Sequence, residues 1–184
     1  MRRKTSLLLL FVLSLLPNWL QAEPIQGLGL HLSVGDLQIS DSSTEQNHAE
    51  SYAYGGIVDY QWTASNYFSV RLFGGEHIGS AQQSNKPNYN YFKTGLFGLE
   101  ARVWAGSSWF LGVQAGQAYL TWIESMESYT KIAWTNQSGY GVGFESGDGW
   151  TFAIYTQKTG DMAFEELPDQ KVEGARLEAG YRWK

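Results

Sequence analysis

A two-residue alternation of apolar and polar side chains dominates the sequence from residue 25 to its end. Between residues 52 and 62, aromatic and aliphatic side chains recur on one parity, while Asp59 and Gln61 fall on the other. A period of two is the spacing of a β-strand whose two faces meet different surroundings. No segment of this region sustains the 3.6-residue period of a helix, so the alternation predicts an all-β fold.

The alternation recurs in eight segments, which we predict to be strands: 28–35, 52–62, 68–72, 94–103, 111–116, 134–145, 150–154 and 174–183. Short connections rich in Ser, Asn, Asp and Gly, at 63–66, 105–108 and 146–149, suit hairpin turns. Longer polar connections are expected near 36–50, 77–88, 123–128 and 159–170. Short and long connections alternate, as in an up-and-down barrel.

Charged side chains lie on one face of these segments, opposite the large apolar residues. Four acids and four bases share that face: Asp59, Arg71, Glu100, Arg102, Glu145, Arg176, Glu178 and Arg182. A narrow interior cannot hold unpaired charges, but a balanced set can pair with itself. The opposite face carries almost no charge across the middle of the strands, as lipid contact requires. We therefore predict an eight-stranded antiparallel up-and-down transmembrane β-barrel, with its charges in the lumen, over a water-soluble barrel or sandwich.

Aromatic residues gather at both ends of the predicted strands, where rings prefer the two membrane interfaces. One predicted girdle lies beside the short turns and contains Trp62, Trp104, Trp109, Trp150 and Trp183. The other lies beside the long connections and contains Tyr52, Tyr54, Tyr119, Trp122 and Trp134. In hydrocarbon every backbone polar group must be paired, so the first strand is expected to pair with the eighth.

The first 22 residues have the pattern of an export signal. Three basic residues precede an apolar run at 7–16, which is too short to span a membrane, and Ala22 offers a cleavage site. We predict a cleaved signal peptide at 1–22 and a barrel domain at 23–184. The chain has a net charge of −5 and no Cys, which argues against nucleic-acid binding and excludes a lipoprotein anchor and a Cys-ligated zinc site.

The last strand ends in Ala179-Gly180-Tyr181-Arg182-Trp183, followed by Lys184. With the export signal and the eight strands, this ending resembles the small outer-membrane β-barrel proteins of Gram-negative bacteria, the OmpA-transmembrane-domain and OmpX-like group. The resemblance covers 23–184 and implies a location in the cell outer membrane. It also implies that Tyr181 and Trp183 form a signal read by the barrel assembly machinery, although the family usually ends on the aromatic residue. Periplasmic chaperones, outer-membrane lipids and lipopolysaccharide are the partners expected of such a monomer.

Catalytic chemistry has few candidates in this chain. Glu76, His77 and Ser80 are the one trio near a strand end that resembles a hydrolase site, while His31 suits the hydrogen bonding of the lumen. The trio does not match the His-x-Ser spacing of lipid A deacylases. Elsewhere, Tyr89, Tyr91 and Phe92 surround Lys93, a grouping that could bind a lipid headgroup or a partner protein. No motif suggests a cofactor or a metal site.

The predicted function is that of a non-enzymatic outer-membrane barrel that contributes to envelope structure or surface interaction. Its predicted surface connections are acidic, through Asp41, Glu45, Glu50, Glu124, Glu127, Asp161, Glu165, Glu166 and Asp169. Two alternatives remain open: an enzyme that modifies lipid A or phospholipids, and a narrow pore for small solutes. The lumen charges could line an ion path, although eight strands leave an interior that side chains can fill.

Overall fold

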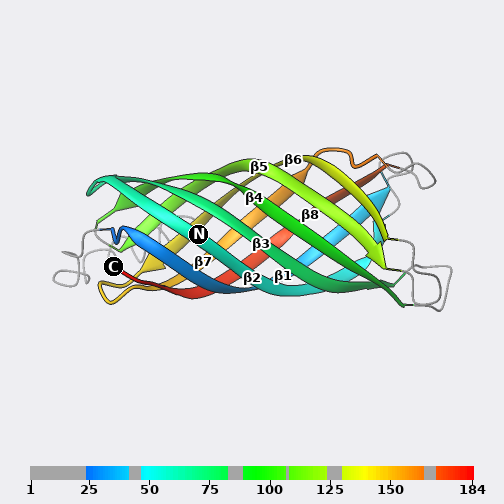
Figure 1. Cartoon of the computed structure of the whole chain (residues 1–184), viewed down its shortest axis with the longest axis horizontal. Helices are drawn as coiled ribbons and strands as arrows, with labels where there is room; N and C mark the ends of the chain where they lie inside the picture. The colour runs from blue at the N-terminus through cyan, green and yellow to red at the C-terminus, as the bar shows by residue number, and fades with distance from the viewer. Residues whose placement is uncertain (1–23, 42–46, 83–88, 107, 124–129, 164–168) are drawn as a thin grey trace, which may run out of the picture.

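Eight antiparallel strands pair in chain order and close into a barrel because β1 also pairs with β8 (Figure 1). The computed structural model describes residues 24–41, 47–82, 89–106, 108–123, 130–163 and 169–184. The strands are β1 (Gly27–Asp41), β2 (Asn47–Ser65), β3 (Phe68–Gln82), β4 (Tyr89–Ala105), β5 (Trp109–Ile123), β6 (Thr130–Glu145), β7 (Trp150–Thr159) and β8 (Gln170–Arg182). The predicted fold class is confirmed.

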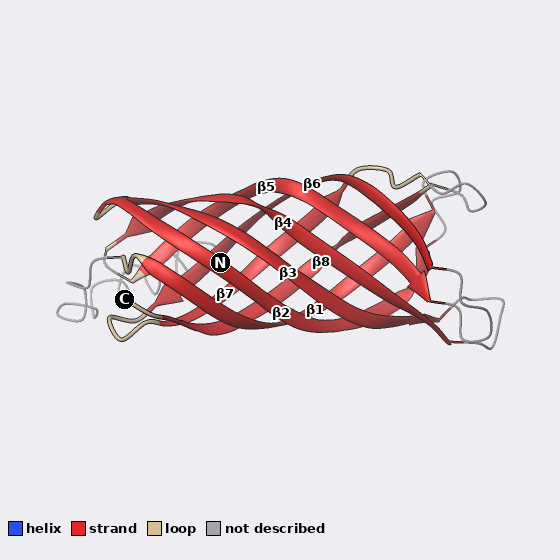
Figure 2. Cartoon of the chain, viewed as in Figure 1, coloured by secondary structure: helices blue, strands red, loops and turns tan. Residues whose placement is uncertain are grey.

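Strands account for nearly all of the described chain (Figure 2). Among the described residues, no helix is long and apolar enough to cross a membrane. The predicted signal peptide at 1–22 lies outside the described residues, and its cleavage stays a prediction.

The strands are longer than the alternation predicts at the end with the long connections. Residues 36–41, 47–50 and 77–82 were expected in connections but belong to β1, β2 and β3, and the backbone of His48 lies in β2. Interstrand pairing continues beyond the residues that show the clearest alternation, because the backbone pairs whatever the side chains contact. The acidic residues Glu45, Glu124, Glu127, Glu165 and Glu166 lie outside the described residues, as do the side chains of Asp41 and Glu50.

The seam between β1 and β8 closes the barrel. It runs from Gly29 paired with Arg182 to Asp41 paired with Gln170. The end of the barrel that carries the short connections is called the turn-side end. There, Gly27 has a φ of 150°, and a Cβ at this position would lie 1.9 Å from the carbonyl oxygen of Trp183. Glycine is therefore required at this position for the two ends of the barrel wall to meet.

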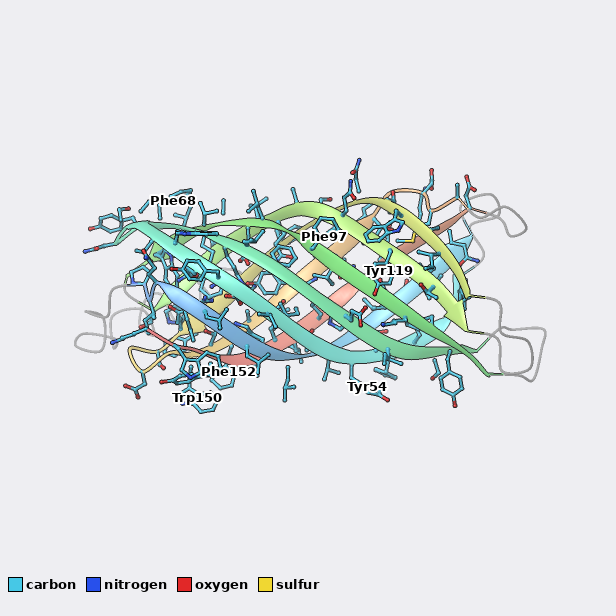
Figure 3. The ribbon with its side chains drawn as sticks, in the orientation of Figure 1. Tyr54, Phe68, Phe97, Tyr119, Trp150 and Phe152 are labelled. Atoms are coloured by element: carbon cyan, nitrogen blue, oxygen red, sulfur yellow. The ribbon has the colours of Figure 1, made fainter. Side chains whose placement is uncertain are left out.

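Apolar side chains cover the outside of the barrel, and charged side chains lie within it. Leu99 and Val113 are 54% and 65% exposed, whereas the neighbouring inward residues Glu100 and Arg102 are fully buried. Figure 3 shows the labelled aromatic side chains on the outer surface of the wall. This arrangement is the reverse of a water-soluble barrel, in which the apolar side chains fill the centre.

Candidate functional site

The centre of the lumen is organised by one guanidinium group. Arg71 on β3 donates from Nε to Asp59 Oδ2 at 2.8 Å, from Nη1 to Glu100 Oε2 at 3.0 Å and from Nη2 to Glu178 Oε2 at 3.0 Å. These carboxylates come from β2, β4 and β8. A fork of N–H groups suits several oxygens at once, so Arg71 joins widely separated parts of the wall.

A second guanidinium group extends this network toward the turn-side end. Arg102 donates to Glu100 Oε1 at 2.9 Å and to Gln61 Oε1 at 2.9 Å. It also donates to the Tyr155 hydroxyl at 2.9 Å, which in turn donates to Glu100 Oε1 at 2.8 Å. Its guanidinium carbon lies 4.0 Å from the ring centroid of Phe110, a cation–π contact.

The remaining predicted lumen charges pair near these two groups. Arg182 donates to Asp59 Oδ1 at 2.5 Å and to Glu145 Oε2 at 3.1 Å. Arg176 donates to Glu178 Oε1 at 2.8 Å. The structure therefore places all eight predicted lumen charges inside the barrel, each with a partner of opposite charge.

Histidine and glutamine side chains complete the polar interior. His31 Nε2 lies 2.7 Å from Asp59 Oδ2, at the predicted lumen position. Gln157 and Gln114 accept hydrogen bonds from Arg176 at 2.9 and 2.7 Å. These glutamines and Tyr155 were not predicted as part of the site.

The turn-side end of the lumen is closed by aromatic rings and by the chain itself. Trp104 is 3% exposed, packs 5.1 Å from Phe110 between ring centroids and donates to Ser69 Oγ at 2.9 Å. The prediction that Trp104 belongs to a girdle is wrong, because Val103 takes the outward position and the next residue must point inward. Ile25 also enters the barrel, where its N–H donates to Glu145 Oε1 at 3.0 Å.

The opposite end of the lumen is filled by apolar side chains. They form one buried cluster: Leu37, Ile39, Ala53, Phe92, Ala118, Leu120, Trp122, Ala133, Met162 and Val172. Trp122 donates to Gln170 Oε1 at 2.9 Å and is 6% exposed, so its predicted place in the outer girdle is also wrong. The parity of β5 explains its position, because Tyr119 lies on the outward face three residues earlier. Phe92 likewise points inward, away from Lys93.

The other predicted girdle residues lie on the outside of the barrel. Those beside the short turns are about half exposed: Trp62, Trp109, Trp150 and Trp183. Tyr52, Tyr54 and Trp134 are exposed toward the other end, and Tyr119 packs against Trp134 with ring centroids 4.9 Å apart. Two outward belts of amphipathic rings separated by an apolar band are typical of a barrel that crosses a bilayer.

The structure does not bring the predicted catalytic trio together. Glu76 and Ser80 are exposed on the outward face, whereas His77 is 2% exposed and points into the lumen. Residues an odd number apart in a strand point to opposite faces, so His77 cannot accept a proton from Ser80 across the wall. The hypothesis that these three residues form a catalytic site is therefore wrong. Among the described residues, no cluster of His, Asp and Glu could hold a metal ion.

The fold, the outward apolar band and the paired interior charges define a small membrane-spanning β-barrel of the outer-membrane type. Among solved structures, the chain is similar to Ail, the attachment invasion locus protein of Yersinia pestis, with a TM-score of 0.56 and 14% identity over 86% of this chain and 100% of that one. It is also similar to Neisserial surface protein A, with a TM-score of 0.59 and 11% identity over 88% of this chain and 100% of that one. No protein-family model and no curated protein sequence matches the chain. At these identities, the similarity shows a shared fold.

Proposed function

We propose that this chain is a non-enzymatic integral protein of the Gram-negative outer membrane, where it contributes to envelope structure or surface interaction. The observation that carries the proposal is the polarity of the barrel. Its outside is an apolar band bordered by aromatic rings, and its inside is a balanced network of charges. Such a molecule is stable in lipid, and its export signal and last strand suit delivery to the outer membrane as a monomer.

The packed lumen supports a structural role over the narrow pore. The guanidinium groups of Arg71 and Arg102 occupy the central region, with Trp104 at one end and the apolar cluster around Trp122 at the other. A conducting path through eight strands needs an open polar channel, and side chains fill this interior. The separation of His77 from Ser80 by the barrel wall supports a non-enzymatic role in the same way.

The surface at the long-connection end carries ion pairs that suit contact with headgroups and solvent. Lys158 Nζ lies 2.8 Å from Glu173 Oε1, and Lys171 Nζ lies 3.2 Å from Asp161 Oδ1. These pairs stand on exposed side chains, where they gain little stability. We propose that this rim, with the acidic residues of the adjoining connections, meets lipopolysaccharide and solvent at the cell surface.

A deletion strain tests this function. Mass analysis of lipid A and phospholipids is expected to show the same lipids with and without the gene, while entry of a bulky hydrophobic dye increases on deletion. The wild-type gene and a His77→Ala variant are both expected to restore the barrier. A change in acyl pattern that the wild-type gene reverses and His77→Ala does not would refute the non-enzymatic role.

The last strand provides a test of the proposed assembly signal. Tyr181 packs against Trp150 and Trp183, with both pairs of ring centroids 5.4 Å apart. The double variant Tyr181→Ala, Trp183→Ala is expected to reduce membrane-inserted protein about tenfold, because the assembly machinery and the interface both lose their aromatic contacts. Protease-protected barrel in membranes is the measurement. Trp62→Ala, a girdle change on another strand, is the control, and an equal loss in both would count against a specific signal.

A further inference from the structure

A groove opens on the outer surface of the barrel over β4, β5 and β6. It has a volume of about 370 Å³ and is lined by Lys93, Tyr119, Thr121, Ile132 and Trp134. Ile132 and Trp134 are more than half exposed, so the groove presents an apolar surface to its surroundings. Figure 3 shows Tyr119 on this outward surface, further from the turn-side end than Phe97.

The order of residues along the strands places the groove beyond the apolar band. Tyr119 and Trp134 belong to the girdle on the side of the long connections. On β5, Thr121 lies past Tyr119 toward those connections. On β6, Ile132 lies past Trp134 in the same direction. Because girdle rings mark the membrane interface, the groove extends from the interface into the headgroup layer and away from the acyl chains.

Two aromatic rings form a wall of the groove, and a glycine allows one of them to lie across β4. In the register of the sheet, Gly95 lies between Glu76 on β3 and Tyr119 on β5. A Cβ at Gly95 would overlap the Tyr119 ring, which therefore needs glycine beneath it. The Tyr119 hydroxyl donates to Glu76 Oε1, and its ring packs 4.9 Å from that of Trp134 between centroids. The wall is thus held in place from both sides.

One cation and one anion stand at the edge of the groove. Lys93 Nζ lies 2.7 Å from Glu76 Oε2, and the two side chains remain 35% and 52% exposed. An ammonium group has three N–H donors and a carboxylate has several acceptor sites, so both groups can bind a further partner while they remain paired. The site thus offers an apolar surface together with hydrogen-bond donors and acceptors.

These features match a sugar ring, which has an apolar face of C–H groups and a rim of hydroxyl groups that both donate and accept. We propose that the groove binds one phosphorylated glucosamine ring of lipid A, the membrane anchor of lipopolysaccharide, an inference that rests on the outer-membrane location proposed above. The C–H face of the ring lies against Trp134 and Ile132. The sugar phosphate accepts a hydrogen bond from Lys93, and a ring hydroxyl donates to Glu76.

A simple phospholipid fits the groove less well. Its acyl chains lie below the groove, at the level of the apolar band, and its headgroup has no flat ring to cover Trp134. Its phosphate would also bring negative charge toward Glu76 without a hydroxyl-bearing ring to satisfy that carboxylate. The sugar ring therefore distinguishes lipid A from an anionic phospholipid at this site.

Native mass spectrometry of the folded protein in detergent tests the proposal with three probes: lipid A, lipid A without its phosphates, and phosphatidylglycerol. The wild type is expected to retain lipid A more strongly than phosphatidylglycerol. Lys93→Ala is expected to weaken lipid A binding about tenfold, because a charge-assisted hydrogen bond to phosphate is lost, and to leave binding of the dephosphorylated lipid nearly unchanged. Trp134→Leu is expected to weaken binding of both sugar lipids about fivefold, because the ring contact is lost, and to spare phosphatidylglycerol.

Lys158→Ala and Trp150→Leu are the matched controls. Lys158 also pairs with a carboxylate on a neighbouring strand, at 2.8 Å, and Trp150 is about as exposed as Trp134, but neither residue lines this groove. Both controls are expected to retain lipid A as the wild type does. Protease resistance establishes that each variant enters the comparison as a folded barrel.

Two results would overturn the proposal. One is wild-type protein that retains phosphatidylglycerol at least as well as lipid A, and the other is a loss of lipid A in Lys93→Ala and Trp134→Leu no greater than in their controls. Either result would reject the groove as a sugar site and leave the proposed envelope function in place. A deletion strain with an intact barrier would count against that function instead, without changing the lipid A binding measured on the purified barrel.

Discussion

Replacing Arg71 by Met is expected to destabilise the barrel by about 3–5 kcal/mol, the cost of removing one partner from a buried ion pair. The loss is large because Arg71 donates to Asp59, Glu100 and Glu178 together. Without it, carboxylates that are shielded from water keep fewer positive neighbours. Urea unfolding in lipid vesicles, followed by tryptophan fluorescence, measures the change in free energy.

Two further variants separate charge from geometry in this experiment. Arg71→Lys keeps the positive charge but has a single nitrogen in place of the forked guanidinium group. The stability of this variant is therefore expected to lie between that of Arg71→Met and that of the wild type. Lys158→Met removes a cation from an exposed pair and is expected to leave the unfolding midpoint unchanged. If Arg71→Met unfolds at the same urea concentration as Lys158→Met, the lumen network does not hold the barrel together.

The barrel could be predicted from the sequence because two independent patterns agree. The alternation sets the number of strands and the face that each residue occupies. The placement of charged residues then decides which face is inside, since Glu100 and Arg102 share a parity opposite to that of Leu99. In a sheet whose two faces meet lipid and a narrow lumen, these parities leave little choice of register.

The misplaced tryptophans show where the same reasoning was applied incompletely. Trp104 and Trp122 were assigned to girdles by their nearness to a strand end, yet their parity places them inside. A pair of large apolar neighbours in one strand must send one side chain to each face. The doublets Leu72-Phe73 and Trp109-Phe110 follow this rule, with Phe73 and Phe110 buried in the lumen. In the sequence, these doublets indicate which apolar side chains point into the lumen.

The partners within the lumen could not be predicted from parity alone. Tyr155 bonds to Arg102 and Glu100 across the width of the barrel, from a strand that pairs with neither β3 nor β4. Such contacts depend on the stagger of the strands around the closed barrel, which sets the height of each residue. The separation of Ser80 from His77, in contrast, follows from their odd spacing, so parity was enough to reject that pair.

A charge introduced into the outward band provides the most direct test of membrane contact. Val113→Arg is expected to cost about 2–4 kcal/mol, as for Arg near a bilayer midplane. Val113 lies on β5 between the outward girdle residues Trp109 and Tyr119 and is 65% exposed. Gln117 lies on the same face of β5, four residues nearer to Tyr119 and to the membrane interface, so Gln117→Arg is expected to cost only about 0–1 kcal/mol.

The difference in free-energy cost between Val113→Arg and Gln117→Arg depends mainly on how deep in the bilayer the new Arg lies. Both introduce the same side chain at an exposed position of one strand, so differences in β-propensity and lost packing are small beside the cost of placing charge in hydrocarbon. Folding titrations into vesicles give the two free energies. Equal costs for Val113→Arg and Gln117→Arg would mean that the apolar band does not meet lipid. The paired charges of the lumen would then need another explanation, because an exterior in water gives no reason to place the ionic residues inside.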